Sequence, residues 1–217
     1  MRTLFALPFV ALFALAFALS SQTSSAVSGE SESAASDTDA TAIFAGGCFW
    51  CVETDFDKVP GVLKTVSGYS GGETDKPTYK NHHQGRHREV VQITYDPSQV
   101  SYEQLLHVFW RSVDPTDGGG QFCDRGHSYT TAIYAVNAEQ QKAANEAKAK
   151  LIDSGVLKDP IATPVQLAGA FWPAEDYHQD YYLKNPLRYK YYRSACGRDK
   201  RVKKIWGSEA YSGIEKS

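Results

Sequence analysis

Two cysteines separated by two residues, Cys48 and Cys51, are the side chains of this sequence best suited to do chemistry. They follow a Gly-Gly pair that separates a short apolar run from a stretch of helical character. Cys48 is therefore expected at a helix N-terminus, where unpaired amides and the helix dipole lower a thiol pKa from about 8.5 into the range of about 3.5–7.5. Such a thiolate is a good nucleophile. Cys51 lies one helical turn further on and could close a disulfide with an oxidised Cys48.

A C-x-x-C pair also fits half of a zinc site or a structural disulfide. A zinc site needs further ligands at suitable spacing, and the other two cysteines, Cys123 and Cys196, stand alone. The histidines at 82, 83 and 87 form no regular pattern. We therefore expect no metal.

Two aromatic residues, Phe49 and Trp50, lie between the paired cysteines. They are suited to form the apolar wall of a pocket for a small thioether or methyl group. They are equally suited to ordinary core packing, and the local sequence leaves both interpretations open.

The N-terminus has the features of an export signal, which we place at residues 1–26. Arg2 supplies a positive charge, residues 4–19 are apolar, and small residues at 24–26 form a cleavage site. The apolar run is shorter than the roughly 20 residues that span a bilayer, although an uncleaved membrane anchor is the alternative. The Ser-, Ala- and acid-rich residues 27–40 are expected to be a disordered linker. We therefore expect an exported protein, periplasmic or extracellular.

The rest of the chain has the composition of a folded domain, which we place at residues 41–207, followed by a tail at 208–217. The 217 residues include 13 Tyr, 10 Phe and 4 Trp, which indicates a sizeable aromatic core. The net charge of −2 gives no general attraction to nucleic acid or anionic membranes. The basic residues 198–204 are expected to form a solvated face. We expect a monomer.

Export would favour disulfides, so the four cysteines could form two structural bridges. A domain of this length can fold without them, and reactive thiols fit the sequence at least as well. The sequence leaves this choice open.

Hydrophobic periodicity and turn residues predict an alternation of strands and helices. The predicted strands are residues 42–45, 62–69, 89–95, 129–136 and 162–167. The predicted helices are residues 48–58, 138–151, 176–183 and one that a capping box opens at Ser101. Polar loops fill residues 73–86 and 114–128, and residues 189–217 are irregular apart from a short helix at 198–206. This order predicts an α+β protein, a two-layer α/β sandwich with a mixed sheet, a ferredoxin-like core and an irregular C-terminal tail.

The segment Gly-Gly-Cys-Phe-Trp-Cys-Val-Glu at residues 46–53 resembles the signature of the A-type peptide methionine sulfoxide reductases. Seven further segments resemble this family in the family's order: residues 60–62, 67–72, 77–79, 87–91, 95–97, 124–129 and 174–179. Together they extend over about residues 42–186. Any one of them would be weak evidence, but the set is specific.

The resemblance implies reduction of the S epimer of methionine sulfoxide, free or in oxidised proteins, without a bound cofactor. It implies that Cys48 is the nucleophile and that Phe49 and Trp50 form the pocket for the substrate methyl. It also implies an external thioredoxin-like dithiol as electron donor.

By the same resemblance, Tyr79, Glu89 and Tyr129 match the groups around the sulfoxide oxygen, and Asp124 matches a carboxylate that orients the substrate. Chemistry supports these roles, because the sulfoxide oxygen is a poor leaving group and must be protonated. A carboxylic acid does this only if it keeps its proton near neutral pH, which burial among aromatic rings favours. Phenol hydroxyls can donate hydrogen bonds to the oxygen.

Attack on the sulfoxide would leave Cys48 as a sulfenic acid, which a second thiol converts to a disulfide. Many members of the family have Gly at the position of Cys51 and use a cysteine in a Gly-rich C-terminal tail. Here Cys51 is the preferred resolving thiol, with Cys196 a close second or a later relay. Cys123 is expected to be a buried structural thiol.

Two other classes of protein remain as alternatives. A thiol–disulfide oxidoreductase could use Cys48 and Cys51, but it would leave Tyr79, Glu89 and residues 124–129 without a role. A secreted zinc or adhesion module would need more metal ligands than the sequence places together.

Overall fold

The computed structural model describes residues 39–215 of the chain. The predicted signal peptide and nearly all of the predicted linker lie outside the described residues. Within these residues, no helix is long and apolar enough to cross a membrane.

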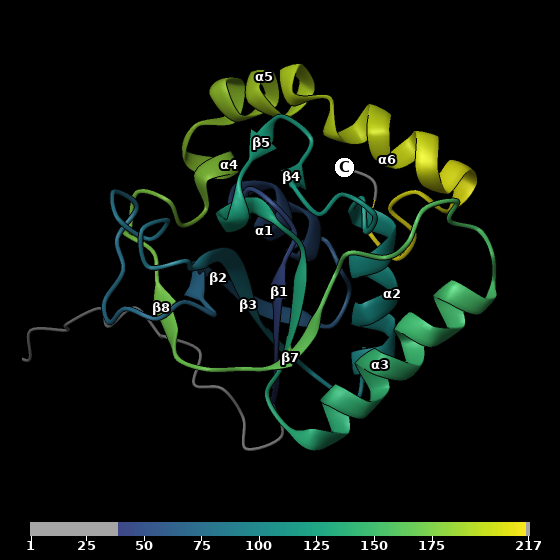
Figure 1. Cartoon of the computed structure of the whole chain (residues 1–217). Coiled ribbons are helices and arrows are strands. Elements are labelled where there is room, and N and C mark those ends of the chain that lie inside the picture. Colours follow the sequence, from purple (N-terminus) through teal and green to yellow (C-terminus); the bar gives the residue numbers. More distant parts are fainter. Residues whose placement is uncertain (1–38, 216–217) are drawn as a thin grey trace, which may run out of the picture. The chain divides into compact units, whose positions relative to one another are not determined.

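Strands and helices alternate through the first part of the chain, and helices make up its end (Figure 1). The first elements are β1 (Ala40–Ala45), α1 (Phe49–Phe56), β2 (Val62–Ser70), β3 (Arg88–Tyr95) and α2 (Tyr102–Ser112). The middle of the chain contains β4 (Gly120–Gln121), β5 (Asp124–Arg125), the 3-10 turn η1 (His127–Tyr129), β6 (Ala132–Ala135) and α3 (Ala138–Asp153). The last are β7 (Val165–Leu167), β8 (Phe171–Pro173), α4 (Tyr181–Lys184), α5 (Pro186–Cys196), α6 (Arg198–Trp206) and the 3-10 turn η2 (Gly207–Glu209).

The main sheet has six strands in the order β7-β6-β1-β3-β2-β8. The β6–β7 pair is parallel and the other four pairs are antiparallel. Helix α1 connects β1 to β2, and α2 follows β3 before the chain returns to the sheet in β6. Strands β4 and β5 form a separate hairpin. The predicted α+β class with a mixed sheet is therefore confirmed.

Strand β1 lies inside the sheet, between β6 and β3, and both of its faces are buried. Phe44 belongs to the main core, where its ring stacks on Phe56 of α1 at 5.4 Å and on Phe109 of α2 at 5.0 Å. Ile43 points to the opposite face and packs in a second cluster with Tyr134 of β6. A strand buried on both faces has no polar alternation, which explains its short continuous apolar sequence.

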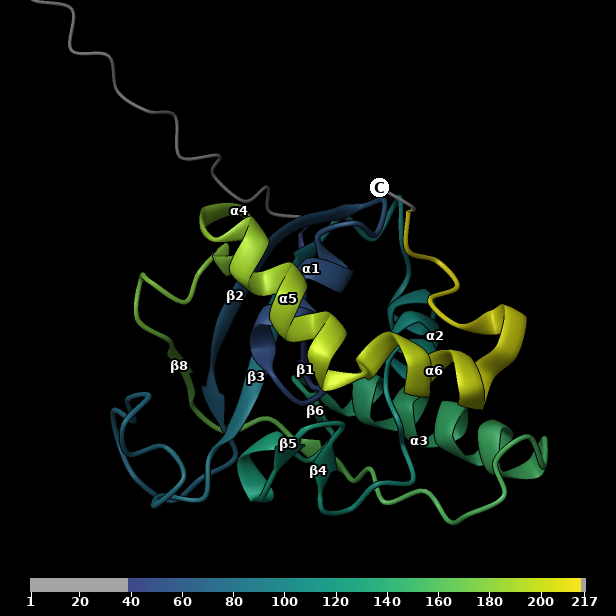
Figure 2. The same ribbon diagram turned by 90° about the horizontal axis from the view of Figure 1, so that it is seen from above.

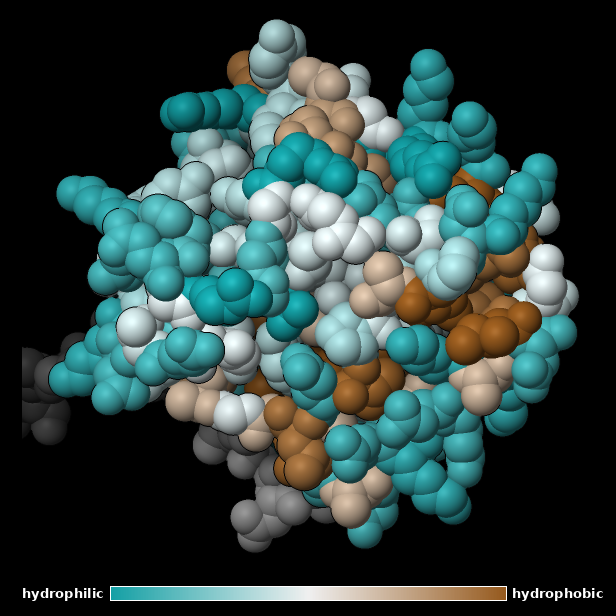
Figure 3. Space-filling view, in the orientation of Figure 1, coloured by the Kyte–Doolittle hydropathy of each residue, from teal (hydrophilic) through white to brown (hydrophobic). Residues whose placement is uncertain are grey.

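Polar side chains cover most of the face drawn in Figure 3, and hydrophobic ones gather near β7 and between α2 and α3. Val136 and Leu167 are among the exposed hydrophobic residues. Scattered exposed hydrophobic side chains are normal for a folded protein and assign no function to this face.

The prediction of an irregular C-terminal tail is wrong, because α5 and α6 fill most of it (Figure 2). Pro186 occupies the first turn of α5, where a proline is favourable because its missing amide has no intrahelical partner. Gly197, at φ +72°, ends α5 and separates it from α6. The expected helix at residues 198–206 is confirmed.

Two other predicted elements are shorter in the structure. The helix expected at residues 176–183 is reduced to α4, because Asp180 has a left-handed backbone at φ +52° and a helix cannot continue through it. The strand expected at residues 129–136 begins only at Ala132, since Tyr129 ends the turn η1. Strands β4, β5 and β8 were not predicted, because two or three residues carry no readable periodicity.

A disulfide joins Cys123, in the β4–β5 hairpin, to Cys196 at the end of α5. The prediction that Cys123 is a buried structural thiol is therefore wrong, since Cys123 is exposed and bonded. The pairing depends on the unexpected helix α5, which brings the two residues together across 73 positions of sequence.

Replacing both Cys123 and Cys196 by alanine should lower the free energy of unfolding by about 2–4 kcal/mol, because the crosslink no longer restricts the unfolded chain. Urea titration of the wild type and the double variant measures this loss. Equal midpoints and slopes for the two proteins would contradict the prediction.

Candidate active site

Cys48 is the N-cap residue of α1, in the turn between β1 and the helix. The turn requires Gly47, which has φ +88° and leaves no space for a Cβ atom beside Gln121. Cys48 is 7% exposed. Cys51 lies one turn further along, with its amide donating to the Cys48 carbonyl at 3.0 Å. The two thiols are therefore held together at the start of one helix, as the sequence predicted.

The predicted low pKa of Cys48 is wrong in direction. Burial, Cys51 and Glu89 raise the pKa of the Cys48 thiol, and only a hydrogen bond with Tyr192 lowers it. The helix N-terminus does not compensate, because the amide of Phe49 donates to Glu89 Oε2 at 3.0 Å. Glu89, and not Cys48, therefore receives the first free amide of α1.

The lowered pKa belongs to Cys51. A hydrogen bond from Cys48 lowers it most, and the positive charges of Arg198 and Arg193 add to the effect against the cost of burial. Cys51 is therefore the thiol of the pair that ionises more readily.

Glu89 lies on β3 opposite Tyr69 and is 2% exposed. Burial raises the pKa of its carboxyl to about 8, although the bond from Phe49 opposes this shift. Glu89 is therefore mostly protonated at neutral pH. This is the state that a general acid beside a thiol requires.

His82 is buried against this acid, with its Nε2 atom 4.0 Å from Glu89 Oε1. The Nδ1 atom of His82 lies 3.0 Å from the carbonyl oxygen of Tyr79 and 3.3 Å from that of Thr78, so Nδ1 carries the proton. Burial lowers the pKa of His82, which leaves Nε2 as a neutral acceptor facing Glu89. Sequence reasoning considered His82 only as a metal ligand and missed this position.

The phenols of Tyr79 and Tyr129 are near the same thiol and acid. Burial first, and then charges that include Glu89, Cys48 and Asp124, raise the pKa of both hydroxyls. Both therefore stay protonated and are able to donate hydrogen bonds. The structure brings together the four residues that the sequence assigned to the sulfoxide oxygen and the nucleophile.

The rings of Phe49 and Trp50 both contact the ring of His178. Phe49 is 1% exposed and lies 5.0 Å from the His178 ring, between centroids. The Trp50 indole donates to His178 Nδ1 at 3.0 Å and stacks flat on Tyr181 at 3.7 Å. These contacts fix both rings beside Cys48. His178 lies in the segment 174–179 that resembles the family, but the sequence assigned it no role.

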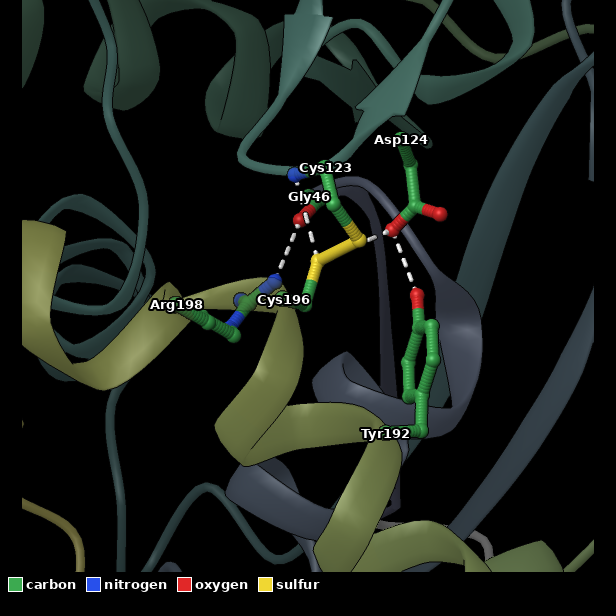
Figure 4. The surroundings of a disulfide bond; sticks show 6 residues. All are labelled: Gly46, Cys123, Asp124, Tyr192, Cys196 and Arg198. Atoms are coloured by element: carbon green, nitrogen blue, oxygen red, sulfur yellow. Dashed lines mark hydrogen bonds between the residues drawn. A yellow bond between two sulfur atoms is a disulfide. The ribbon is translucent and has the colours of Figure 1, made fainter.

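Asp124 is held in the β4–β5 hairpin beside the disulfide (Figure 4). Its Oδ2 atom accepts a hydrogen bond from the Tyr192 hydroxyl and lies 3.7 Å from Cys196 Sγ. Burial raises the pKa of this carboxyl, and the bond from Tyr192 opposes that shift. The described residues place Cys123, Asp124 and Cys196 close enough to suggest a metal cluster, but in the disulfide the two sulfurs offer no thiolate.

Two arginines from the C-terminal helices support the α1 segment. Arg193 forms an ion pair with Asp55 at 2.7 Å and lies 3.5 Å from the Cys51 carbonyl oxygen. Arg198 is fully buried and donates to the Gly46 carbonyl at 2.9 Å (Figure 4). The solvated face predicted for residues 198–204 is therefore wrong at Arg198. Nothing local distinguishes a buried arginine within a basic run.

A buried thiol beside a protonated carboxyl, with a second free thiol one turn away, defines a thiol-dependent oxidoreductase. The family model of the peptide methionine sulfoxide reductases matches residues 40–210, and the chain belongs to this family. The protein therefore reduces methionine sulfoxide, as a peptide-methionine (S)-S-oxide reductase.

Individual relatives agree with this assignment. The chain is 59% identical over 174 residues to peptide methionine sulfoxide reductase MsrA 2 of Rhizobium meliloti (strain 1021), covering 80% of this chain and 86% of that protein. It is 54% identical over 168 residues to peptide methionine sulfoxide reductase MsrA of Bacillus licheniformis, covering 76% and 93%.

Solved structures share the fold. Methionine sulfoxide reductase A of Corynebacterium diphtheriae superimposes with a TM-score of 0.64 at 34% identity, over 70% of this chain and 77% of that one. Mxr1 from Saccharomyces cerevisiae in reduced form gives a TM-score of 0.63 at 28% identity, over 69% and 87%.

Proposed function

We propose that Cys48 attacks the sulfur of methionine S-sulfoxide while Glu89 protonates the oxygen. The observation that carries this proposal is the position of Glu89. Its buried carboxyl has a pKa of about 8 and bonds to the amide of the residue that follows Cys48. An acid that keeps its proton at neutral pH therefore lies beside the thiol that must attack.

The reductase step balances without a cofactor. Glu89 gives its proton to the sulfoxide oxygen and receives the proton that Cys48 loses. The bond between sulfur and oxygen in the substrate breaks, and a new one at Cys48 gives the sulfenic acid. The substrate sulfur gains the two electrons that the Cys48 sulfur loses.

The surrounding side chains fit the other requirements of this step. Tyr79 and Tyr129 are protonated phenols that can donate to the oxygen as it gains negative charge. Asp124 orients the polar part of the substrate, and Phe49 with Trp50 contacts the methyl group.

Cys51 is our proposed resolving thiol. Its pKa is lowered by the hydrogen bond from Cys48 and by the charges of Arg198 and Arg193, so it supplies a thiolate one turn from Cys48. Attack of this thiolate on Cys48 forms the disulfide and releases the oxygen as water after protonation. Cys196 is the weaker candidate, because it is already bonded to Cys123.

A thioredoxin-like dithiol outside the protein would reduce the Cys48–Cys51 disulfide by thiol exchange.

The basic and apolar residues at the N-terminus support export to the periplasm or beyond, with a membrane anchor as the alternative. The enzyme would act as a monomer. The strand order β6-β1-β3-β2 supports a ferredoxin-like core that carries the site.

The test of the resolving thiol compares Cys51→Ser with the double variant Cys123→Ser, Cys196→Ser. Without a reductant, Cys51→Ser should release about one methionine per enzyme and keep a sulfenic acid that dimedone traps, because no thiol is left beside Cys48. With a dithiol of the thioredoxin type it should lose most of its multiple turnover. The double variant is the matched control and should keep on turning over.

Normal recycling of Cys51→Ser together with failure of the double variant would reverse the assignment in favour of Cys196. Mass spectrometry of the wild type after one turnover gives an independent check, since a Cys48–Cys51 disulfide is expected.

A further inference from the structure

We propose that Tyr192 is a further catalytic residue, whose hydroxyl links the Cys48 thiol to Asp124, and that the Cys123–Cys196 disulfide holds it there. The inference rests on the proposed function, in which Cys48 is the nucleophile. It goes beyond that function because neither Tyr192 nor the disulfide has a role in it.

The contacts of Tyr192 place its hydroxyl inside the site. The hydroxyl donates to Asp124 Oδ2 and forms a hydrogen bond with Cys48 (Figure 4 shows the bond to Asp124). The ring meets Trp50 edge-on, with centroids 5.7 Å apart and planes at 80°. Tyr192 thus contacts the nucleophile, the orienting carboxylate and one ring of the methyl pocket.

The disulfide joins the two segments that carry the partners of the Tyr192–Asp124 hydrogen bond. Cys123 is the residue before Asp124, and Cys196 lies four residues after Tyr192, one turn along the same helix. The amide of Cys123 also donates to Cys196 Sγ at 3.1 Å. The crosslink therefore fixes the hairpin that carries Asp124 against the helix that carries Tyr192.

The Tyr192 hydroxyl has one proton and two acceptors, Asp124 Oδ2 and the Cys48 sulfur, so it can donate to only one of them at a time. In the resting site Cys48 is a thiol, and the Tyr192 proton is directed to Asp124. As Cys48 loses its proton during attack, the hydroxyl turns to the sulfur and stabilises its negative charge. The same rotation frees Asp124 Oδ2 for the substrate.

The groups that face Tyr192 keep it protonated throughout. Burial raises the pKa of its phenol most, followed by the negative charge of Cys48, the hydrogen bonds to Asp124 and Cys48, and the charge of Cys51. Tyr192 is therefore a hydrogen-bond donor and not a base.

The test removes only the hydroxyl, by Tyr192→Phe. The matched control is Tyr191→Phe, the neighbouring residue on α5, which is 77% exposed. Rapid-quench measurement of one turnover with the S epimer should give a rate about ten-fold lower for Tyr192→Phe than for the control, as expected for losing a hydrogen bond to a charged group.

A second readout separates this role from a structural one. In a Cys51→Ser background, where Cys48 is the one free thiol among the cysteines, the pH dependence of iodoacetamide alkylation reports the pKa of Cys48. Tyr192→Phe should move the midpoint up by about one pH unit, since the thiolate loses its donor. The double variant Cys123→Ser, Cys196→Ser should shift it in the same direction.

Unchanged midpoints and single-turnover rates for Tyr192→Phe, relative to Tyr191→Phe, would overturn the proposal. If the double serine variant retains the wild-type midpoint, the disulfide has no part in it. Failure of the proposed function is distinguishable, because it would appear as turnover that survives Cys48→Ser.

Coupling to Asp124 gives a last check. Tyr192→Phe and Asp124→Asn each remove a hydrogen bond that the resting site makes and the attacking site gives up, which offsets part of either single loss, so the double variant should lose more than the product of the two single losses. Fully multiplicative losses would show that the two side chains act independently and would overturn the link.

Discussion

Cys48→Ser is expected to lose reduction of the S epimer by a factor on the order of 10⁴ or more, since removal of a covalent nucleophile leaves only binding and positioning. A serine hydroxyl in the same buried position is a much weaker nucleophile than a thiol. It also gives no stable oxidised form that corresponds to the sulfenic acid. The measurement is methionine released from an S-sulfoxide peptide with excess dithiol.

The matched control for this loss is Cys51→Ser, three residues further along α1. It removes a sulfur that is also buried but should keep the first turnover. Both variants should show the far-ultraviolet circular dichroism of the wild type. Turnover of the S epimer by Cys48→Ser at more than a few per cent of the wild-type rate would disprove the assignment of the nucleophile.

Glu89→Gln should slow the reductase step by about 10²–10⁴-fold, the range typical of a lost general acid. The wild-type rate should also fall as pH rises through about 8. The sign follows from the raised pKa of Glu89, which is about 8 because the carboxyl is buried. Below this pH Glu89 holds the proton that the oxygen needs, and above it the proton is lost. Single-turnover rates between pH 6 and pH 10 measure this decline.

In Glu89→Gln the alkaline decline should disappear, because glutamine does not titrate. Glu53→Gln is the matched control. Glu53 is also buried, on the same helix as Cys51, and burial raises its pKa to about 8 as well. Its carboxyl forms hydrogen bonds with the Asp180 backbone and the Ser67 side chain, and its pKa is shifted by these groups and Asp57 rather than by the thiols. If Glu53→Gln removes the alkaline decline and Glu89→Gln keeps it, Glu89 is not the acid.

Several elements could be predicted from the sequence because their signals are local. The capping box at Ser101 begins α2 as expected, with Gln104 closing it. β1 ends at Ala45, and Gly47 in the turn that follows allows Cys48 to become the N-cap residue of α1. These features depend on residues within one or two turns of each other, so a short window contains all the necessary information.

The C-terminal region could not be predicted in the same way. Residues 189–217 are basic and aromatic with weak periodicity, yet they form two helices whose side chains point inward at Tyr192, Arg193 and Arg198. A buried arginine is stable only with partners, and here the partners are Asp55 and main-chain carbonyls far away in sequence. No local sequence pattern predicts that these arginines pair with groups so far away in the sequence.

The sequence by itself determined the types and spacing of the reactive groups in α1, and with them the chemistry that a thiol pair at a helix N-terminus can do. Tertiary structure decided which thiol has the lower pKa. The free amide of Phe49 is directed to Glu89, and burial raises the pKa of Cys48. A hydrogen bond from Cys48, with the charges of Arg198 and Arg193, lowers the pKa of Cys51. Tertiary structure also paired Cys123 with Cys196 and brought Tyr192 to the nucleophile. Charge and desolvation act through space, so the ionisation of a side chain depends on neighbours that only the folded chain brings near.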